Sequence, residues 1–286
     1  MRHYLLLHLA VLIAGFTGIL GKTITLNEGL LVWYRVLFAS ILLFFIVKVI
    51  FRKNRLQAKE KVEIVKVGMI LTLHWVFFYG SIKYSNVSIG VVCYGLCGFF
   101  TSIFKPLLEK SKFHVSELML SILSVLGISF IFHFDVAYRT GIVLGVISSA
   151  LGALYTIFNA RIVNKYDNLT INYYQMLGGT IGLGVLLPVY LRFFPVDRFL
   201  PALNDIFYLI ILSLFCTIGL YFALVEAMKK IPVFTINLSF NLEPIYAILL
   251  AFLIFNESKE VNFAFYIGLS IIVISVVLQT FKSIKK

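Results

Sequence analysis

Residues 237–255 form an apolar stretch, NLSFNLEPIYAILLAFLIF, with Glu243 and Pro244 side by side near its start. A carboxylate inside a membrane is costly, so it faces protein or water and marks a path for a solute or a proton. Pro244 leaves the carbonyl of Phe240 without a helical partner, which is tolerated at membrane depth only beside protein or water. The pair therefore indicates a binding surface with Pro244 as its hinge. In the structural alternative, Glu243 pairs with Arg35 or hydrogen-bonds the backbone freed by the proline.

A helical wheel separates the polar and apolar side chains of this stretch. One stripe is apolar and is expected to face lipid: Leu238, Leu242, Ile245 and Leu249. The candidate substrate-binding side chains lie away from it: Asn237, Asn241, Glu243 and Tyr246. Burial without a cation would favour the protonated form of Glu243, making it a candidate proton carrier for coupling. A simple facilitator would need no such residue.

Other apolar segments also carry polar and aromatic side chains in their interiors. Candidates to line the same site are His74, Phe78, Tyr79, Tyr94, Tyr155 and Asn159. Tyr155 and Asn159 are four residues apart and share a helix face. A lone histidine in a membrane span can equally be hydrogen-bonded packing. Arg35 has three alternatives: reaching outward to water, pairing with Glu243, or meeting an anionic substrate.

The composition indicates an all-α integral membrane protein, because 60% of the 286 residues are hydrophobic and only 13% are charged. The apolar residues fall into runs long enough to cross a bilayer as helices. Ten spans are expected, at about 4–21, 29–48, 63–82, 86–107, 115–133, 141–161, 170–191, 205–227, 233–255 and 263–281. The first run is too long for a signal peptide and lacks a cleavage site, so we expect it to be retained.

The basic residues predict how these spans are oriented. If the N-terminus is inside, 18 of the 25 Lys and Arg residues lie on the cytoplasmic side and 6 on the other, with Arg35 inside a span. Such a bias is typical of the positive-inside rule and places both termini in the cytoplasm of an inner-membrane protein. It also accounts for the net charge of +12 without a nucleic-acid partner.

The two halves of the chain are similar in order. Segment 31–43 aligns with 170–183, and segment 106–128 aligns with 252–277. We therefore predict two five-helix repeats, residues 1–135 and 138–286. Because each has an odd number of spans, the second must be inverted relative to the first. Inverted repeats are typical of alternating-access carriers, with the substrate near midplane at the repeat interface.

These features resemble the EamA branch of the drug/metabolite transporter superfamily. The matching residues are the glycine-containing first span ending at Lys22, Arg35 in the second span, Pro244, Glu257 and Gly268. The resemblance covers nearly the whole chain and implies efflux of a small metabolite. The first half departs from the pattern, since its fourth span has neither a proline nor an acid where Pro244 and Glu243 would fall.

We therefore expect a secondary transporter that exports a small metabolite, such as an amino acid or related organic solute, with protons as a candidate coupling ion. The sequence has no phosphate-binding loop and no metalloprotease or serine-hydrolase motif, so neither an enzyme, a cofactor nor a metal site is expected. The alternatives are an integral-membrane enzyme acting on lipid or prenyl substrates, a channel and a lipid scramblase. The sequence leaves the oligomeric state open.

Overall fold

The computed structural model describes residues 2–50, 56–134, 136–240 and 242–284. These residues form helices and no strands. The α-helices are α1 (Arg2–Thr23), α2 (Glu28–Ile50), α3 (Ala58–Lys83), α4 (Val87–Tyr94), α5 (Cys97–Glu109), α6 (Val115–Phe134), α7 (Arg139–Ala160), α8 (Asn168–Phe193), α9 (Leu203–Ser213), α10 (Leu220–Met228), α11 (Val233–Phe240), α12 (Glu243–Phe255) and α13 (Phe263–Ile284). A π-helical turn (Leu214–Gly219) joins α9 to α10, and short 3₁₀ turns cover Val136–Tyr138 and Glu257–Lys259.

Seven segments of the described chain are long and apolar enough to cross a membrane. They are Arg2–Thr23, Glu28–Val47, Ala58–Lys83, Val87–Glu109, Val136–Ala160, Asn168–Phe193 and Leu203–Met228. Three shorter apolar helices, Ser121–His133, Glu243–Phe255 and Phe263–Ser275, lie where the sequence predicts the fifth, ninth and tenth spans. The protein is therefore an all-helical, multi-pass membrane protein, as expected, while the count of ten spans stays a prediction, because seven helices of the described chain reach full spanning length.

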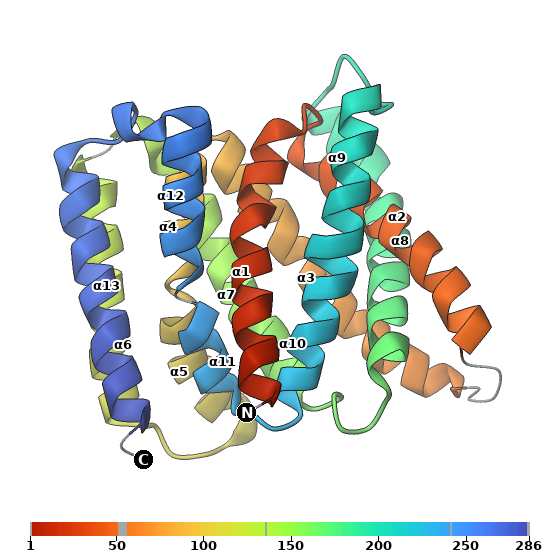
Figure 1. Ribbon diagram of the computed structural model, residues 1–286, viewed down its shortest axis with the longest axis horizontal. Helices are drawn as coiled ribbons and strands as arrows, with labels where there is room; N and C mark the ends of the chain where they lie inside the picture. Colours follow the sequence, from red (N-terminus) through yellow and green to blue (C-terminus); the bar gives the residue numbers. More distant parts are fainter. Residues whose placement is uncertain (1, 51–55, 135, 241, 285–286) are drawn as a thin grey trace.

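The helices run roughly side by side, and α1 begins at the same end of the molecule at which α13 ends (Figure 1). We call this the terminal end and the opposite one the distal end. In the centre, α3 packs against α7 and α8, while α1 packs against α10 and α12. The pairs α6–α13 and α2–α8 form the two edges. The central helices are thus enclosed on both sides.

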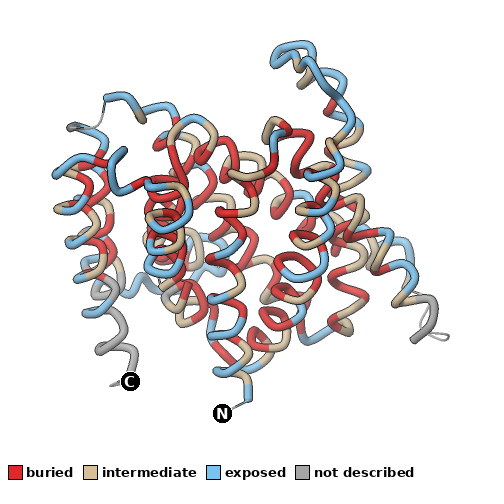
Figure 2. Tube along the Cα trace, turned by 45° about the horizontal axis from the view of Figure 1, so that its top comes forward, coloured by how far each residue is buried: buried red, intermediate tan, exposed pale blue. Residues whose placement is uncertain are grey.

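The outer surface is apolar. Figure 2 shows buried residues along the inner faces of the helices and exposed residues around the periphery. Large apolar side chains that are more than half exposed include Leu5, Ile181, Val185, Leu253 and Phe263. Apolar surface of this extent marks contact with another apolar phase, which for a multi-pass protein is the lipid.

Glycines allow α3 and α8 to approach closely, as small residues do in membrane helices. A Cβ at Gly68 would lie 2.4 Å from the backbone oxygen of Gln175, which cannot rotate away. We therefore expect Gly68→Ala to lower the free energy of unfolding by about 1–3 kcal/mol, the usual cost of overpacking. Thermal unfolding of the purified protein in detergent would measure this.

Gly80 on the same helix provides the matched control. A Cβ there would lie 3.3 Å from Cδ1 of Leu144, a flexible side-chain end that can move. Gly80→Ala should therefore leave the unfolding temperature unchanged or raise it, because alanine favours the helix. Equal destabilisation by both substitutions would contradict the close backbone contact at Gly68.

Candidate functional site

The stretch around Glu243 is divided between two helices. α11 ends at Phe240 and α12 begins at Glu243, with Pro244 in its first turn. A proline fits this position because the first backbone N–H groups of a helix have no intrahelical acceptor. The sequence predicts one continuous span from 233 to 255, and the structure has a break instead. Asn241, one of the candidate site residues, lies outside the described residues.

The corresponding stretch in the first half is divided in the same way. α4 has 8 residues and α5 has 13, and α11 and α12 have the same lengths. Both longer helices end in a left-handed residue, Lys110 with φ 51° and Asn256 with φ 56°. The break at Gly95 and Leu96 has no proline and was not expected from the sequence. Two interrupted spans, α4–α5 and α11–α12, therefore have their breaks near the centre of the molecule.

A small cavity of about 30 Å³ lies at this centre, between α1, α2, α3, α4, α10, α11 and α12. Six of its lining side chains are aromatic rings: His74, Trp75, Phe78, Tyr94, Tyr221 and Phe240. Arg35 and Glu243 carry ionisable groups, and the others are Ala14, Thr17 and Leu220. A volume of about 30 Å³ accommodates roughly two water molecules. An organic solute would therefore require the cavity to widen.

Arg35 is completely buried beside this cavity. Its guanidinium donates to Oγ1 of Thr217 at 2.7 Å, to the Tyr79 hydroxyl at 2.8 Å and to the carbonyl of Cys216 at 2.7 Å. It also lies 3.7 Å from the centre of the Trp75 ring. All these partners are neutral, and no described carboxylate lies within ion-pair distance of it. The charge is oriented by hydrogen bonds but is not neutralised.

The π-helical turn supplies two of these partners. Cys216 and Thr217 lie within Leu214–Gly219, and Thr217 Oγ1 donates to the carbonyl of Leu212 at 2.9 Å. A π-helical turn shifts the backbone hydrogen bonds by one residue and is frequent at functional sites. Here the Cys216 carbonyl accepts from Arg35. The turn therefore fixes the position of the arginine.

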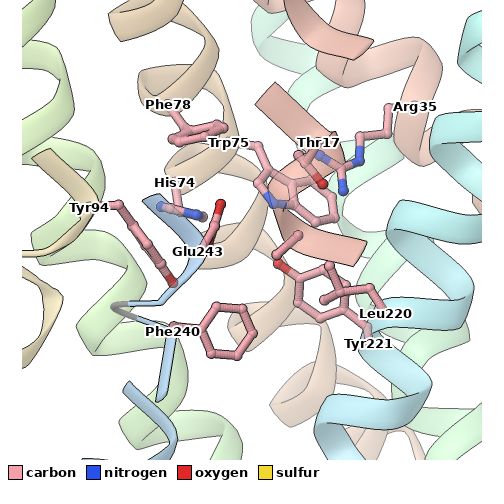
Figure 3. A pocket seen from close by; sticks show the side chains of 11 residues that line it. Thr17, Arg35, His74, Trp75, Phe78, Tyr94, Leu220, Tyr221, Phe240 and Glu243 are labelled. Atoms are coloured by element: carbon pink, nitrogen blue, oxygen red, sulfur yellow. The ribbon is translucent and has the colours of Figure 1, made fainter. Parts of the chain in front are cut away.

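Glu243 is 4% exposed, and within the described chain its carboxyl has no hydrogen bond or ion pair. Figure 3 shows it pointing into the cavity among the rings of His74, Phe78 and Trp75. The Arg35–Glu243 ion pair considered from the sequence does not form. A buried arginine and a buried carboxyl group that do not pair with each other therefore line one cavity.

His74 is held by the neighbouring helix α7. Its Nδ1 lies 2.8 Å from the carbonyl oxygen of Ser148, and the Ser148 hydroxyl donates to the His74 carbonyl at 3.0 Å. Because a carbonyl oxygen only accepts, Nδ1 carries the proton in this arrangement. The neutral ring then presents Nε2 as an acceptor. Its centre lies 5.3 Å from that of Tyr94.

The cavity brings together four of the residues that the sequence suggests: Glu243, His74, Phe78 and Tyr94. Others lie around it without lining it. Tyr79 contacts Arg35, and Asn237 donates to Thr101 Oγ1 at 2.7 Å, joining α11 to α5. Tyr246 is 40% exposed. These three therefore do not line the site in this conformation.

Tyr155 and Asn159 belong to a second buried cluster on α7 and α8. Asn159 accepts from Gln175 Nε2 at 2.8 Å, and the Tyr155 hydroxyl lies 3.5 Å from Gln175 Oε1. The Tyr155 ring lies 5.9 Å from that of Tyr221, which does line the cavity. These residues therefore adjoin the site behind Tyr221.

Seven lining residues were not among the site candidates from the sequence, although Arg35 was considered there as a contact for an anionic substrate. The seven are Ala14, Thr17, Arg35, Trp75, Leu220, Tyr221 and Phe240. Arg35 was the one with a clear signal, a charge inside an apolar span. Within the described chain, no group of three or more His, Cys, Asp or Glu side chains gathers as metal ligands would. The chemistry available is thus binding by charge, hydrogen bonds and aromatic surface.

Comparison with known proteins agrees with this arrangement of membrane helices around a charged cavity. The sequence model of the EamA-like transporter family matches residues 1–133 and again residues 139–281. The chain belongs to this family, and the resemblance drawn from its sequence is confirmed. A solved crystal structure has a TM-score of 0.67 and 13% identity, covering 98% of this chain and 97% of that one. That likeness concerns the fold alone.

Two relatives carry the description of uncharacterized transporter. The protein from Clostridium kluyveri is 26% identical over 207 residues, which cover 70% of this chain and 65% of that protein. The protein from Archaeoglobus fulgidus is 25% identical over 165 residues, covering 57% of this chain and 58% of that protein. The matches thus span less than two thirds of each relative.

Proposed function

We propose that this protein is a secondary transporter that exports a small organic solute across the inner membrane by alternating access. The observation that carries the proposal is the central cavity, where buried Arg35 and Glu243 line one space without neutralising each other. Burying the arginine charge without a counter-charge is expensive in a membrane, and a ligand whose anionic group contacts Arg35 while its cationic group contacts the carboxyl of Glu243 offsets that cost. A direct ion pair between Arg35 and Glu243 would stabilise the folded protein more than this unpaired arrangement does.

The architecture we propose is ten spans in two inverted five-span repeats, residues 1–135 and 138–286. In it, α4–α5 and α11–α12 each form one interrupted span, and α9–α10 form another. The double match of the family's sequence model supports this, as do the equal lengths of the interrupted helices. Contacts support it too: α3 packs on α7 as α10 packs on α1, which is the relation a two-fold axis would produce.

The substrate we propose is a zwitterion such as an amino acid or a related organic solute. Its anionic group would contact the donors of Arg35 that remain beside its three bonds, and its cationic group would contact Glu243. The rings of Trp75, Tyr94 and Phe240 suit an apolar or aromatic remainder. The separation of the charges would select solutes that carry both.

Protons are the coupling ion we propose. One carboxyl cannot hold a proton and the cationic group of the solute together, so the two would compete for Glu243. Inward movement of protons would then drive export of the solute. The bias of basic residues supports termini in the cytoplasm. The outward direction of the exchange follows from the resemblance to the family.

Reconstitution into proteoliposomes tests the proposal. Vesicles loaded with one unlabelled amino acid should accumulate the labelled form by counterflow, with saturation and with competition by other zwitterions. A comparison of the growth medium of overexpressing and deleted cells would identify the natural solute. Non-saturable flux would indicate a channel, lipid movement a scramblase, and a chemically altered lipid an enzyme, and each would overturn the carrier.

A further inference from the structure

The distal end of the molecule contains a second buried carboxylate, which the central cavity does not use. Glu257 follows α12 and is 0% exposed. Its Oε1 accepts from Lys22 Nζ at 2.8 Å and from the backbone N–H of Val87 at 3.0 Å. Its Oε2 accepts from the backbone N–H of Ser88 at 2.9 Å and from the Ser88 hydroxyl at 2.7 Å. We call this group of residues the distal clasp.

The distal clasp joins three helices that also line the cavity. Lys22 is in the last turn of α1, which contributes Ala14 and Thr17 to the cavity. Val87 and Ser88 begin α4, which ends at Tyr94. α12 begins at Glu243 and leads to Glu257. A single side chain thus connects the distal ends of α1, α4 and α12.

The hydrogen bonds that Glu257 accepts in the distal clasp stabilise its ionised form. Burial alone would raise the pKa of Glu257, but the hydrogen bonds from Lys22, Ser88 and Val87 outweigh it and hold the pKa below its ordinary value. The carboxylate also lies at the start of α4, where the helix dipole favours a negative charge. Charged hydrogen bonds of this kind are roughly twice as strong as neutral ones.

At the terminal end, the acid in the place that corresponds to Glu257 makes no such contact. α5 ends in the same left-handed turn as α12, and its last acid, Glu109, is exposed. Within the described residues Glu109 accepts no hydrogen bond and pairs with no base. The ends of the two helices therefore differ: the distal end of α12 is fastened by a fully buried carboxylate and the terminal end of α5 is not. The carboxylates that join other segments at the terminal end, Glu63 and Glu226, are partly exposed.

From this difference we propose that Glu257 is the latch that closes the cavity toward the distal end, and that its release from α1 and α4 opens the cavity to that side. The proposal rests on the alternating-access function proposed above. The state described by the structure is then the latched one. In the cycle, α4 and α12 separate at their distal ends while the terminal end closes.

Spin-label distance measurements on the purified full-length protein in nanodiscs test this without knowledge of the solute. One label pair reports on the distal end, at Tyr84→Cys and Ser258→Cys, and the other on the terminal end, at Lys112→Cys and Lys230→Cys. All four positions are on the surface or at its edge, and the three native cysteines are buried. Glu257→Gln should raise the ratio of long to short distal distances about tenfold, the effect of losing a charged hydrogen bond.

Glu260→Gln is the matched control. Glu260 is in the same turn, is 43% exposed and lies 3.9 Å from Lys22, so its loss should leave both distance distributions unchanged. Ser88→Ala removes one bond of the clasp without removing a charge, and it should shift the distal distances in the same direction by a smaller amount. It also serves if Glu257→Gln does not fold.

The outcomes separate the latch from the transport cycle. A lower unfolding temperature with unchanged distal distances, in Glu257→Gln or in Ser88→Ala, would show a purely structural clasp and overturn the latch. If the distal end widens and the terminal end narrows, both proposals gain support. If the distal end widens while the terminal end stays as it is, the latch stands and alternating access fails.

Discussion

Arg35→Gln is expected to reduce transport of a zwitterionic solute at least about 30-fold while the protein still folds. Loss of a buried charge that contacts a ligand costs about 2–5 kcal/mol, and each factor of ten corresponds to about 1.4 kcal/mol. The groups left behind can be satisfied. Thr217 still donates to Leu212, and the Tyr79 hydroxyl lies beside a cavity with room for water.

Arg35→Lys distinguishes charge from geometry. Lysine keeps the positive charge but lacks the planar fork that reaches Tyr79, Thr217 and Cys216 together and stacks on Trp75. We expect an intermediate loss. Counterflow in proteoliposomes measures both variants, and Arg139→Gln, at an exposed arginine, is the control expected to behave as the wild type.

Comparing the transport of two solutes shows whether Arg35 binds the carboxylate of the solute. The wild type should prefer an amino acid over its carboxamide, because only the carboxylate has a charge to place at Arg35. Arg35→Gln should transport both equally poorly. If the variant lowers the unfolding temperature but retains the preference, Arg35 stabilises the bundle and does not bind the solute.

The sequence predicts most of the membrane helices because span length and hydrophobicity are properties of local segments. It does not predict where a span is interrupted without a proline. At the α4–α5 junction, the backbone N–H groups of Gly95 and Leu96 donate to the carbonyls of Val92 and Cys93, each three residues earlier in the chain. Any residue can adopt the right-handed conformation that these turns need, so the sequence carries no mark of them.

Tyr246 shows a second limitation, which is that a helical wheel does not locate the edge of the buried face. The helical wheel assumes one continuous helix from 233 to 255, and it places Tyr246 beside Glu243. Both residues lie within α12, three positions apart, so the break before Glu243 does not change their relation. Within α12, Ala247, Ile248 and Ala251 are buried, while Tyr246, Leu249 and Leu253 share the exposed face. Ile245 and Leu249 are exposed, as the wheel predicts for the apolar stripe, and Tyr246 lies at the edge between the buried and the exposed face of α12.

The sequence around Arg35 predicts that this residue is unusual but not which groups it contacts. Its position inside an apolar span identifies it as unusual. Its partners Thr217 and Cys216 are 182 and 181 residues away and are presented by a π-helical turn. Only tertiary structure decides that these neutral groups, and not Glu243, surround the guanidinium.

Glu243→Gln is expected to abolish the response of transport to an imposed pH gradient while leaving exchange measurable. The amide has nearly the shape of the protonated acid, and the carboxyl has no described partner that the change would orphan. The amide oxygen still accepts from a cationic group, so counterflow should persist with its KM raised about tenfold, the cost of one charged hydrogen bond. What the amide cannot do is exchange a proton.

The measurement is uptake or release of labelled solute in proteoliposomes with and without a pH difference across the membrane. The wild type should accumulate solute against its gradient when the pH difference is present, and Glu243→Gln should only equilibrate it. Glu226→Gln is the control, because Glu226 is paired with Lys229 and lies outside the cavity. If Glu243→Gln responds to the gradient as fully as the wild type, the competition between proton and solute at this carboxyl is wrong. Coupling would then have to arise elsewhere in the chain.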